Sequence, residues 1–198
     1  MSSALTLLLV LSQTPGWRED RTVDGMKVEL RAVAGSKFEE VRVSTTSSSS
    51  LGALCDAVWG KGLSNKKPEG EFKKRVVIKE TEDERWTYEQ IRVPVVADRD
   101  YVIHVQRLSD APSGRCEIAF ETREDPRFPP TADHVRIPAI RGKWRLVPNP
   151  AGRVDVSYVV YSDPGGSVPS LLARGGQRDA AVGFLKVILA RAKALSGG

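Results

Sequence analysis

Alternation of apolar and polar residues with a period of two runs through most of this chain and constrains its fold more than any other feature. Strands that bury one face of a sheet produce this period, because successive side chains point to opposite faces. Turn-forming residues separate the segments, and no rhythm of alternating strands and helices interrupts them, so we expect one antiparallel sheet. The predicted strands are Met26–Ala34, Lys37–Thr45, Glu71–Glu80, Arg85–Val93, Arg99–Leu108, Arg115–Arg123, Val135–Ile137, Gly142–Val147 and Arg153–Tyr161.

A short segment after the second strand has the period of a helix. Leu51–Trp59 carries apolar residues three and four positions apart. A run of serines precedes it and can supply the N-cap, while Gly60 and Gly62 are suited to end it. We therefore predict a helix over Leu51–Trp59.

The C-terminal segment also has the period of a helix. Arg178–Leu195 carries a long apolar stripe with charged residues on the opposite side. Pro169–Arg174 looks like an earlier helical turn, which Gly175 and Gly176 should break or hinge. The predicted fold class is α+β: a long curved antiparallel sheet wrapped around one C-terminal amphipathic helix.

Length and charge limit the classes of partner. A chain of 198 residues fits one domain, and we expect a monomer. The net charge is +5, but charges of both signs are interspersed and no basic-aromatic nucleic-acid module occurs. We therefore expect no nucleic-acid partner. The basic excess allows transient contact with an anionic membrane surface, which depends on where Arg174, Arg178 and Arg191 point.

The two cysteines, Cys55 and Cys116, form no CxxC or Cys/His motif. They can pair if the fold brings them together, but we interpret them as two buried free thiols.

Residues 1–16 contain the apolar run Ala4–Leu11, which is too short to cross a bilayer as a helix of about 20 residues. One interpretation is the hydrophobic region of a secretory signal, which favours an exported or periplasmic protein. The alternative is an N-terminal helix that covers part of the core of a cytoplasmic protein. In both cases residues 17–198 form the main domain.

Catalytic signatures are missing from the sequence, and the two histidines belong to no recognisable motif. His104 lies mid-strand on the parity expected to face outward, and His134 lies in a loop. We expect no metal, no cofactor and no enzymatic activity. In Asp98-Arg99-Asp100 we expect the arginine to hold a strand end by hydrogen bonds to the two carboxylates that flank it.

Apolar and aromatic side chains recur at strand positions that we assign to one face. They can form a packed core, or they can line an apolar pocket in which tyrosine hydroxyls orient a ligand. The set comprises Trp86, Tyr88, Tyr101, Ile103, Val105, Ile118, Phe120, Trp144, Leu146, Val156 and Tyr158.

Several motifs follow one another along nearly the whole chain. They are Trp17 with Asp24-Gly25-Met26-Lys27-Val28-x-x-Arg31, Val93-Pro94 with Asp98-Arg99-Asp100-Tyr101-Val102, Val135-Arg136, Trp144-x-Leu146-x-Pro148, and Asp163-Pro164-Gly165-Gly166-x-Val168-Pro169. In order and spacing they resemble the START (steroidogenic acute regulatory protein-related lipid-transfer) domains.

This resemblance implies a helix-grip fold whose sheet and C-terminal helix enclose an apolar tunnel for one lipid or other hydrophobic molecule. Pro169–Leu195 would form a lid hinged at the two glycines, adding Leu172, Val182 and Leu185 to the tunnel wall. Arg99, Asp100, Asp163, Gly166 and Pro169 would be structural motif residues. Trp86 and Val105 align where steroid-binding members carry a buried acid and base, so an apolar wall is expected there.

The leading hypothesis is a protein that sequesters or transfers a hydrophobic ligand. The alternatives are a polyketide cyclase-like or hydrolase-like enzyme on the same fold, and an interaction module with a filled core.

Overall fold

The computed structural model describes residues 16–60, 72–93, 96–166 and 170–196, with side chains from residue 175 onward in the last range. Its strands are β1 (Arg18–Val23), β2 (Met26–Ala32), β3 (Glu39–Ser47), β4 (Phe72–Glu80), β5 (Glu84–Ile91), β6 (Arg99–Ser109), β7 (Cys116–Arg123), β8 (Val135–Arg136), β9 (Ala139–Pro148) and β10 (Val154–Asp163). The helices are α1 (Leu51–Trp59), the short 3-10 helix η1 (Ala111–Ser113) and α2 (Ser170–Ser196).

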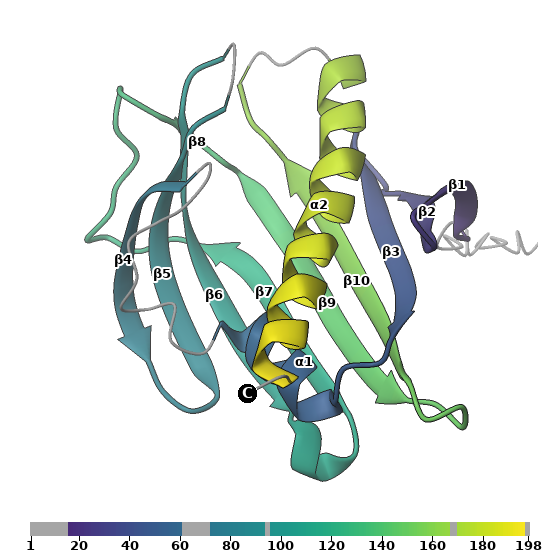
Figure 1. Cartoon of the computed structure of the whole chain (residues 1–198). Helices are drawn as coiled ribbons and strands as arrows, with labels where there is room; N and C mark the ends of the chain where they lie inside the picture. The colour runs from purple at the N-terminus through teal and green to yellow at the C-terminus, as the bar shows by residue number, and fades with distance from the viewer. Residues whose placement is uncertain (1–15, 61–71, 94–95, 167–169, 197–198) are drawn as a thin grey trace, which may run out of the picture.

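All ten strands form one sheet in the order β1-β2-β3-β10-β9-β7-β6-β5-β4, and β8 adds a short parallel pairing to β6. The sheet curves, and α1 and α2 lie on its inner side (Figure 1). The α+β fold class with a curved antiparallel sheet and a C-terminal helix is confirmed.

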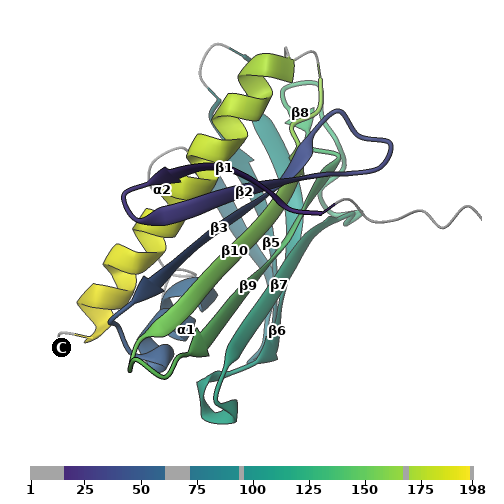
Figure 2. The same cartoon turned by 90° about the vertical axis from the view of Figure 1, so that its right-hand side faces the viewer.

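The first strand, β1, was not predicted from the sequence. It pairs with β2 through a tight turn in which Asp24 and Gly25 both have positive φ angles, 51° and 75°. This backbone suits an Asp-Gly pair, and Asp-Gly between two strand-like segments was the signal available in the sequence. Figure 2 shows the β1–β2 hairpin crossing beside α2 at a steep angle to the other strands. Arg21 pairs with Asp179 and Lys186 with Asp24, both at 2.5 Å, and these pairs tie the hairpin to α2.

Helix α1 begins and ends where the sequence predicts. The Ser50 side chain accepts a hydrogen bond from the Ala53 amide at 3.2 Å, and Gly60 ends the helix with φ 76°.

The interpretation of the cysteines as free thiols is wrong. Cys55 of α1 and Cys116 of β7 form a disulfide with a Cα–Cα distance of 5.9 Å, because α1 packs against the inner side of β7 and β9.

Helix α2 is continuous from Ser170 to Ser196, so the predicted break at Gly175 and Gly176 is wrong. A hinge at these glycines stays a prediction. A glycine costs a helix only about 1 kcal/mol relative to alanine. Tertiary contacts just after the glycines fix the helix on the sheet: Gln177 donates to the Glu39 carbonyl at 3.2 Å, and Arg178 pairs with Asp20 at 3.1 Å. Among the described residues, no helix is long and apolar enough to span a membrane.

The packed core lies between α2, α1 and the β2–β3–β10–β9 part of the sheet. Ala181, Val182, Leu185, Ile188 and Ala192 of α2 are buried in it. Helix α2 contacts α1, β3, β10 and β2, whereas β4 and β5 stand away from it at the far end of the sheet (Figure 1).

Gly142 of β9 sits in a space too small for any side chain. A Cβ atom there would lie 2.2 Å from the Val159 carbonyl oxygen and 2.4 Å from the Phe120 ring. We expect Gly142→Ala to lower the free energy of unfolding by about 1–3 kcal/mol, since the backbone oxygen cannot move aside as a side chain can. Gly183→Ala is the matched control, because a Cβ there meets nothing within 4 Å on an exposed helix position. Urea unfolding that ranks the two variants in the opposite order would contradict this.

Candidate ligand-binding site on the inner face of the sheet

Aromatic rings gather where α2 meets the inner face of the sheet. Trp144 of β9 stacks on Tyr158 of β10 with ring centres 4.2 Å apart, and Phe120 of β7 lies 6.0 Å from Tyr158. Phe184 of α2 packs against Trp144 and Tyr158 at 5.8 and 5.6 Å, yet 44% of Phe184 remains exposed. Burial raises the pKa of Tyr158, which therefore stays protonated. We call these four residues the aromatic cluster.

A polar cluster lies on the same face, nearer the β4 edge. Glu89 of β5 is buried and accepts hydrogen bonds from the Tyr101 hydroxyl and from Arg75 Nε, each at 2.6 Å. The Thr87 hydroxyl lies 3.5 Å from the same carboxylate. Burial, and then the charge of Glu89, hold the pKa of Tyr101 well above its ordinary value, so its hydroxyl is a donor. Ile103 and Val105 are half-buried on this face, farther along β6 than Tyr101.

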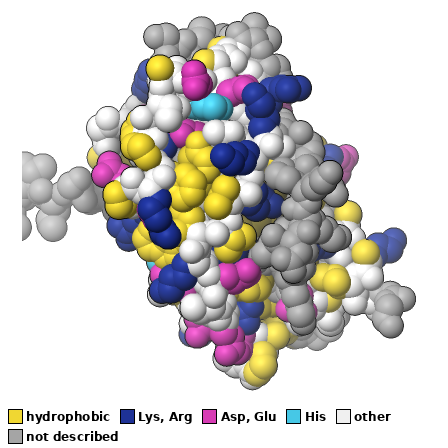
Figure 3. Space-filling model, turned by 90° about the vertical axis from the view of Figure 1, so that its left-hand side faces the viewer, with side chains coloured by type: hydrophobic (Ala, Val, Ile, Leu, Met, Phe, Trp, Pro, Cys, Tyr) yellow, Lys and Arg dark blue, Asp and Glu magenta, His cyan; other side chains and the backbone are white. Residues whose placement is uncertain are grey.

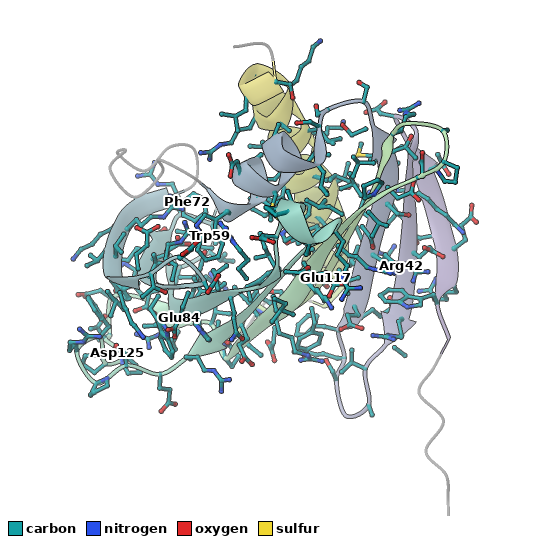
Figure 4. All side chains as sticks on the ribbon, turned by 90° about the horizontal axis from the view of Figure 1, so that it is seen from below. Arg42, Trp59, Phe72, Glu84, Glu117 and Asp125 are labelled. Carbon is teal, nitrogen blue, oxygen red and sulfur yellow. A yellow bond between two sulfur atoms is a disulfide. The ribbon has the colours of Figure 1, made fainter. Side chains whose placement is uncertain are left out.

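Two further cations stand on the inner face beside Trp59, the last residue of α1. The Arg85 and Arg107 guanidinium carbons lie 5.3 and 4.5 Å from the centre of its indole ring. Burial lowers the pKa of Arg85, with Glu80 opposing the shift. Figure 4, seen from below, labels Trp59 beyond the end of α1, on the side toward β4 and β5.

The assignment of Trp86 and Tyr88 to the same face as Tyr101 is wrong. In the β5–β6 ladder Tyr88 pairs with Val102, while Glu89 pairs with Tyr101, so Trp86 and Tyr88 point to the outer face. There the Trp86 ring stacks on His104 at 4.4 Å, and Tyr88 stacks on Phe128 at 4.5 Å. His104 lies on the outer face, as predicted from its parity.

Polar residues therefore take the inward positions of β5, where an apolar wall was expected. The expectation rested on Trp86 facing inward beside Val105, and only Val105 does so. Three charged inner-face residues were missed: Arg75, Glu89 and Arg85. Arg107, which the sequence places within reach of the cavity strands, lies on the same face. The alternation of Arg85, Thr87 and Glu89 was the available signal, but the aromatic residues between them have the stronger burial preference. Phe184 was also missed, because it flanks the main apolar stripe of α2.

The structure distributes the remaining predicted cavity residues over two environments. Tyr101, Ile103, Val105, Phe120, Trp144 and Tyr158 lie on the inner face, and of these Trp144 and Tyr158 also belong to the packed core. Ile118, Leu146, Val156, Val182 and Leu185 belong to the packed core. The Leu172 side chain and Pro169 lie outside the described residues.

The predicted pairing of Arg99 with both flanking carboxylates is wrong. Asp98 pairs with Lys73 at 2.5 Å, and Asp100 receives two hydrogen bonds of 2.9 Å from Arg136. Arg99 instead donates to the carbonyls of Ala97 and Pro164, because its inward position points it toward the turn after β10.

That turn contains two further structural motif residues from the sequence analysis. The Asp163 carboxylate accepts a hydrogen bond from the Gly165 amide at 2.9 Å. Gly165 and Gly166 both have positive φ angles, 65° and 62°, which favour glycine. The motif thus anchors the junction between β10 and α2.

Of the three α2 arginines named in the sequence analysis, the structure describes the side chains of Arg178 and Arg191. Arg178 pairs with Asp20 and Glu39 and is only 25% exposed in its side chain. Arg191 is half-buried, and the side chain of Arg174 lies outside the described residues. On the side of the molecule at β4, hydrophobic side chains reach the surface among lysines and arginines (Figure 3).

The curved antiparallel sheet that grips a long C-terminal helix defines the helix-grip class of folds. No protein-family model matches the chain. The chain is similar to an uncharacterised protein of Pseudomonas aeruginosa PAO1, PA1579, with 31% identity over 172 residues, 86% of this chain and 83% of that protein.

Solved structures agree with this class. The STAR-related lipid transfer protein from Xanthomonas axonopodis matches with a TM-score of 0.76 and 28% identity, covering 90% of this chain and 99% of that one. Human STARD10 matches with a TM-score of 0.74 and 18% identity, covering 89% of this chain and 73% of that one, which shows the shared fold. The fold is that of START domains, and the resemblance to this family found in the sequence is confirmed.

Proposed function

We propose that this START domain binds one hydrophobic small molecule of the lipid class on the inner face of its sheet, and sequesters or transfers it. The observation that carries the proposal is Phe184, which packs on Trp144 and Tyr158 while 44% of it stays exposed. An apolar ligand lying along β6 and β7 would cover that ring. The similarity to a lipid transfer protein of Xanthomonas supports the same ligand class.

Apolar burial would supply most of the affinity, at about 25 cal/mol for each Å² removed from water. The aromatic cluster offers the apolar surface, and the polar cluster offers a place for a hydroxyl or carbonyl group of the ligand. Tyr101 is the natural orienting group for a ligand hydroxyl, since it donates its own proton to Glu89 and its oxygen can still accept a hydrogen bond.

Native mass spectrometry of the purified protein, with solvent extraction of the same sample, tests the proposal. We expect an apolar mass bound in a one-to-one ratio. A protein that arrives empty and takes up no fluorescent sterol, fatty acid or phospholipid would overturn the proposal and favour a filled-core interaction module.

Ile103→Asp is expected to weaken ligand binding at least about 30-fold, or about 2 kcal/mol, because it places a carboxylate against the ligand's apolar body. Ile103 is half-buried on the inner face between Thr87 and Thr122. Gln106→Asp, exposed on the outer face of the same strand, is the control and should bind as the wild type does. The measurement is fluorescence titration of folded protein, and equal affinity of the two variants would contradict the site.

A second candidate function is chemistry on the bound molecule, as in a cyclase-like enzyme. The observation that favours it is the buried Glu89 carboxylate with Tyr101, Thr87 and Arg75 around it, which is a polar constellation facing the inside of the sheet. Incubation of the extracted ligand with fresh protein distinguishes the two. A carrier leaves the ligand mass unchanged, whereas an enzyme changes its mass or its chromatographic retention.

A further inference from the structure

Two arginines on the inner face share one indole ring. Arg85 of β5 pairs in register with Val105 of β6, so Arg107 takes the diagonal position on the same face. Both guanidinium groups lie over Trp59, within 5.3 Å of the ring centre. Two positive charges thus flank Trp59 at the α1 end of the inner face, and Figure 4 shows where Trp59 lies.

The two arginines differ in their carboxylate partners. Arg85 forms an ion pair with Glu80 at 3.7 Å. Arg107 has no ion pair with a described residue, and its buried Nε atom has no hydrogen-bond partner. Glu89, the buried carboxylate of this face, is already engaged by Arg75 and Tyr101. A buried donor without an acceptor is costly, which points to an acceptor that the described residues do not supply.

The arginine pair is continuous with the aromatic cluster. Val105 lies two residues before Arg107 on β6 and pairs with Phe120 of β7, whose ring is 6.0 Å from Tyr158. The inner-face side chains therefore form one continuous path from Trp59 past Val105 to the aromatic cluster.

We propose that Arg85 and Arg107 bind the anionic head group of the ligand, either a carboxylate or a phosphate monoester, while the aromatic cluster holds its apolar body. This inference rests on the proposed function, since it adds a head-group preference to the same site. Guanidinium groups present forked donors that match both anions, and Trp59 keeps the two forks in place. The oxygen of an uncharged lipid would accept a hydrogen bond from the Arg107 Nε atom but would not neutralise the guanidinium charges.

The test compares two fluorescent probes that differ in charge, 11-(dansylamino)undecanoic acid and its methyl ester. We expect the wild type to bind the acid at least about tenfold more tightly than the ester. Arg107→Met should remove this preference by weakening the acid about tenfold, while it leaves the ester unchanged. Arg107→Lys should keep most of the preference because it keeps the charge.

Arg145→Met is the matched control, because Arg145 lies on the outer face of β9 with 62% of its side chain exposed, and it should change neither affinity. If Arg107→Met does not fold, as judged by thermal unfolding, Arg85→Met is measured in the same way.

Displacement of the acid probe by dodecanoate or by dodecyl phosphate then distinguishes a carboxylate from a phosphate head group. The stronger competitor identifies the head group.

Equal affinity of the wild type for acid and ester would overturn the head-group assignment and leave the apolar site standing. Equal loss of acid and ester in a folded Arg107→Met would also overturn it, since that result assigns the arginine a purely structural role. Failure of the wild type to bind either probe would instead count against the proposed function itself.

Discussion

Reduction of the Cys55–Cys116 disulfide is expected to lower the free energy of unfolding by about 4 kcal/mol. The bridge closes a loop between residues 61 positions apart, and a loop of this length removes much of the entropy of the unfolded chain. For a domain of this size the loss corresponds to a fall in Tm of roughly 10 °C. The measurement is urea unfolding at 25 °C with and without dithiothreitol.

The double variant Cys55→Ala/Cys116→Ala controls for direct effects of the reductant, because it should unfold at the same urea concentration in both conditions. A wild-type midpoint that does not respond to dithiothreitol, in protein shown by thiol titration to be reduced, would contradict the expected role of the bridge.

Arg136→Met is expected to lower the free energy of unfolding by about 3–5 kcal/mol, since it leaves a buried carboxylate without its cation. Asp100 is fully buried and receives two hydrogen bonds of 2.9 Å from Arg136, which also donates to the Phe128 carbonyl. Chemical denaturation at pH 7 measures the effect. Arg127→Met is the matched control: Arg127 makes the same bidentate contact with Asp125, but on the surface, so little or no change is expected.

The Asp100 pair also predicts a pH dependence. Burial alone would raise the pKa of Asp100, but the hydrogen bonds and charge of Arg136, with the Tyr88 hydroxyl, bring it below its ordinary value. The pair therefore stabilises the fold above the ordinary pKa of about 4, and this stability is lost as the pH falls toward the lower folded-state pKa. In Arg136→Met the raising effect of burial dominates, so the deficit of the variant should shrink below about pH 4. Parallel pH profiles for wild type and variant would contradict this account.

The sequence predicted most of the fold because its apolar periods agree with the final packing. Leu51–Trp59 has the predicted bounds, and its caps at Ser50 and Gly60 act as expected. β1 was not predicted because its apolar and polar residues alternate only weakly and most of its side chains are exposed. Gly175 and Gly176 were misleading, since contacts made by Gln177 and Arg178 with the sheet outweigh the low helix propensity of glycine.

The candidate site was harder to predict because β5 reverses the usual rule of apolar residues inward. Its outer face is covered by the segment that carries Phe128, so Tyr88 is buried there although it faces away from the helices. Its inner face carries Thr87 and Glu89, which are buried with hydrogen-bond partners. A sequence-based choice of the inward face depends on one face being more hydrophobic than the other. Because both faces of β5 are buried, this difference disappears, and the register of β5 on its neighbouring strands is needed to tell which face points inward.

The sheet order also has a consequence for how the chain folds. β3 pairs with β10, so the hydrogen-bond ladder of residues 41–47 cannot form until residues 154–160 have been synthesised. The meander β4–β5–β6–β7 needs only neighbouring segments and can form while synthesis continues. Among the strand pairs, closing the distant β3–β10 pair has the largest loop-closure entropy, which makes it a slow step of folding. Before that pair forms, the core-facing residues of α1 are not covered by a complete sheet. The nascent chain therefore exposes apolar surface to other chains until the last third of its length has been made and has folded.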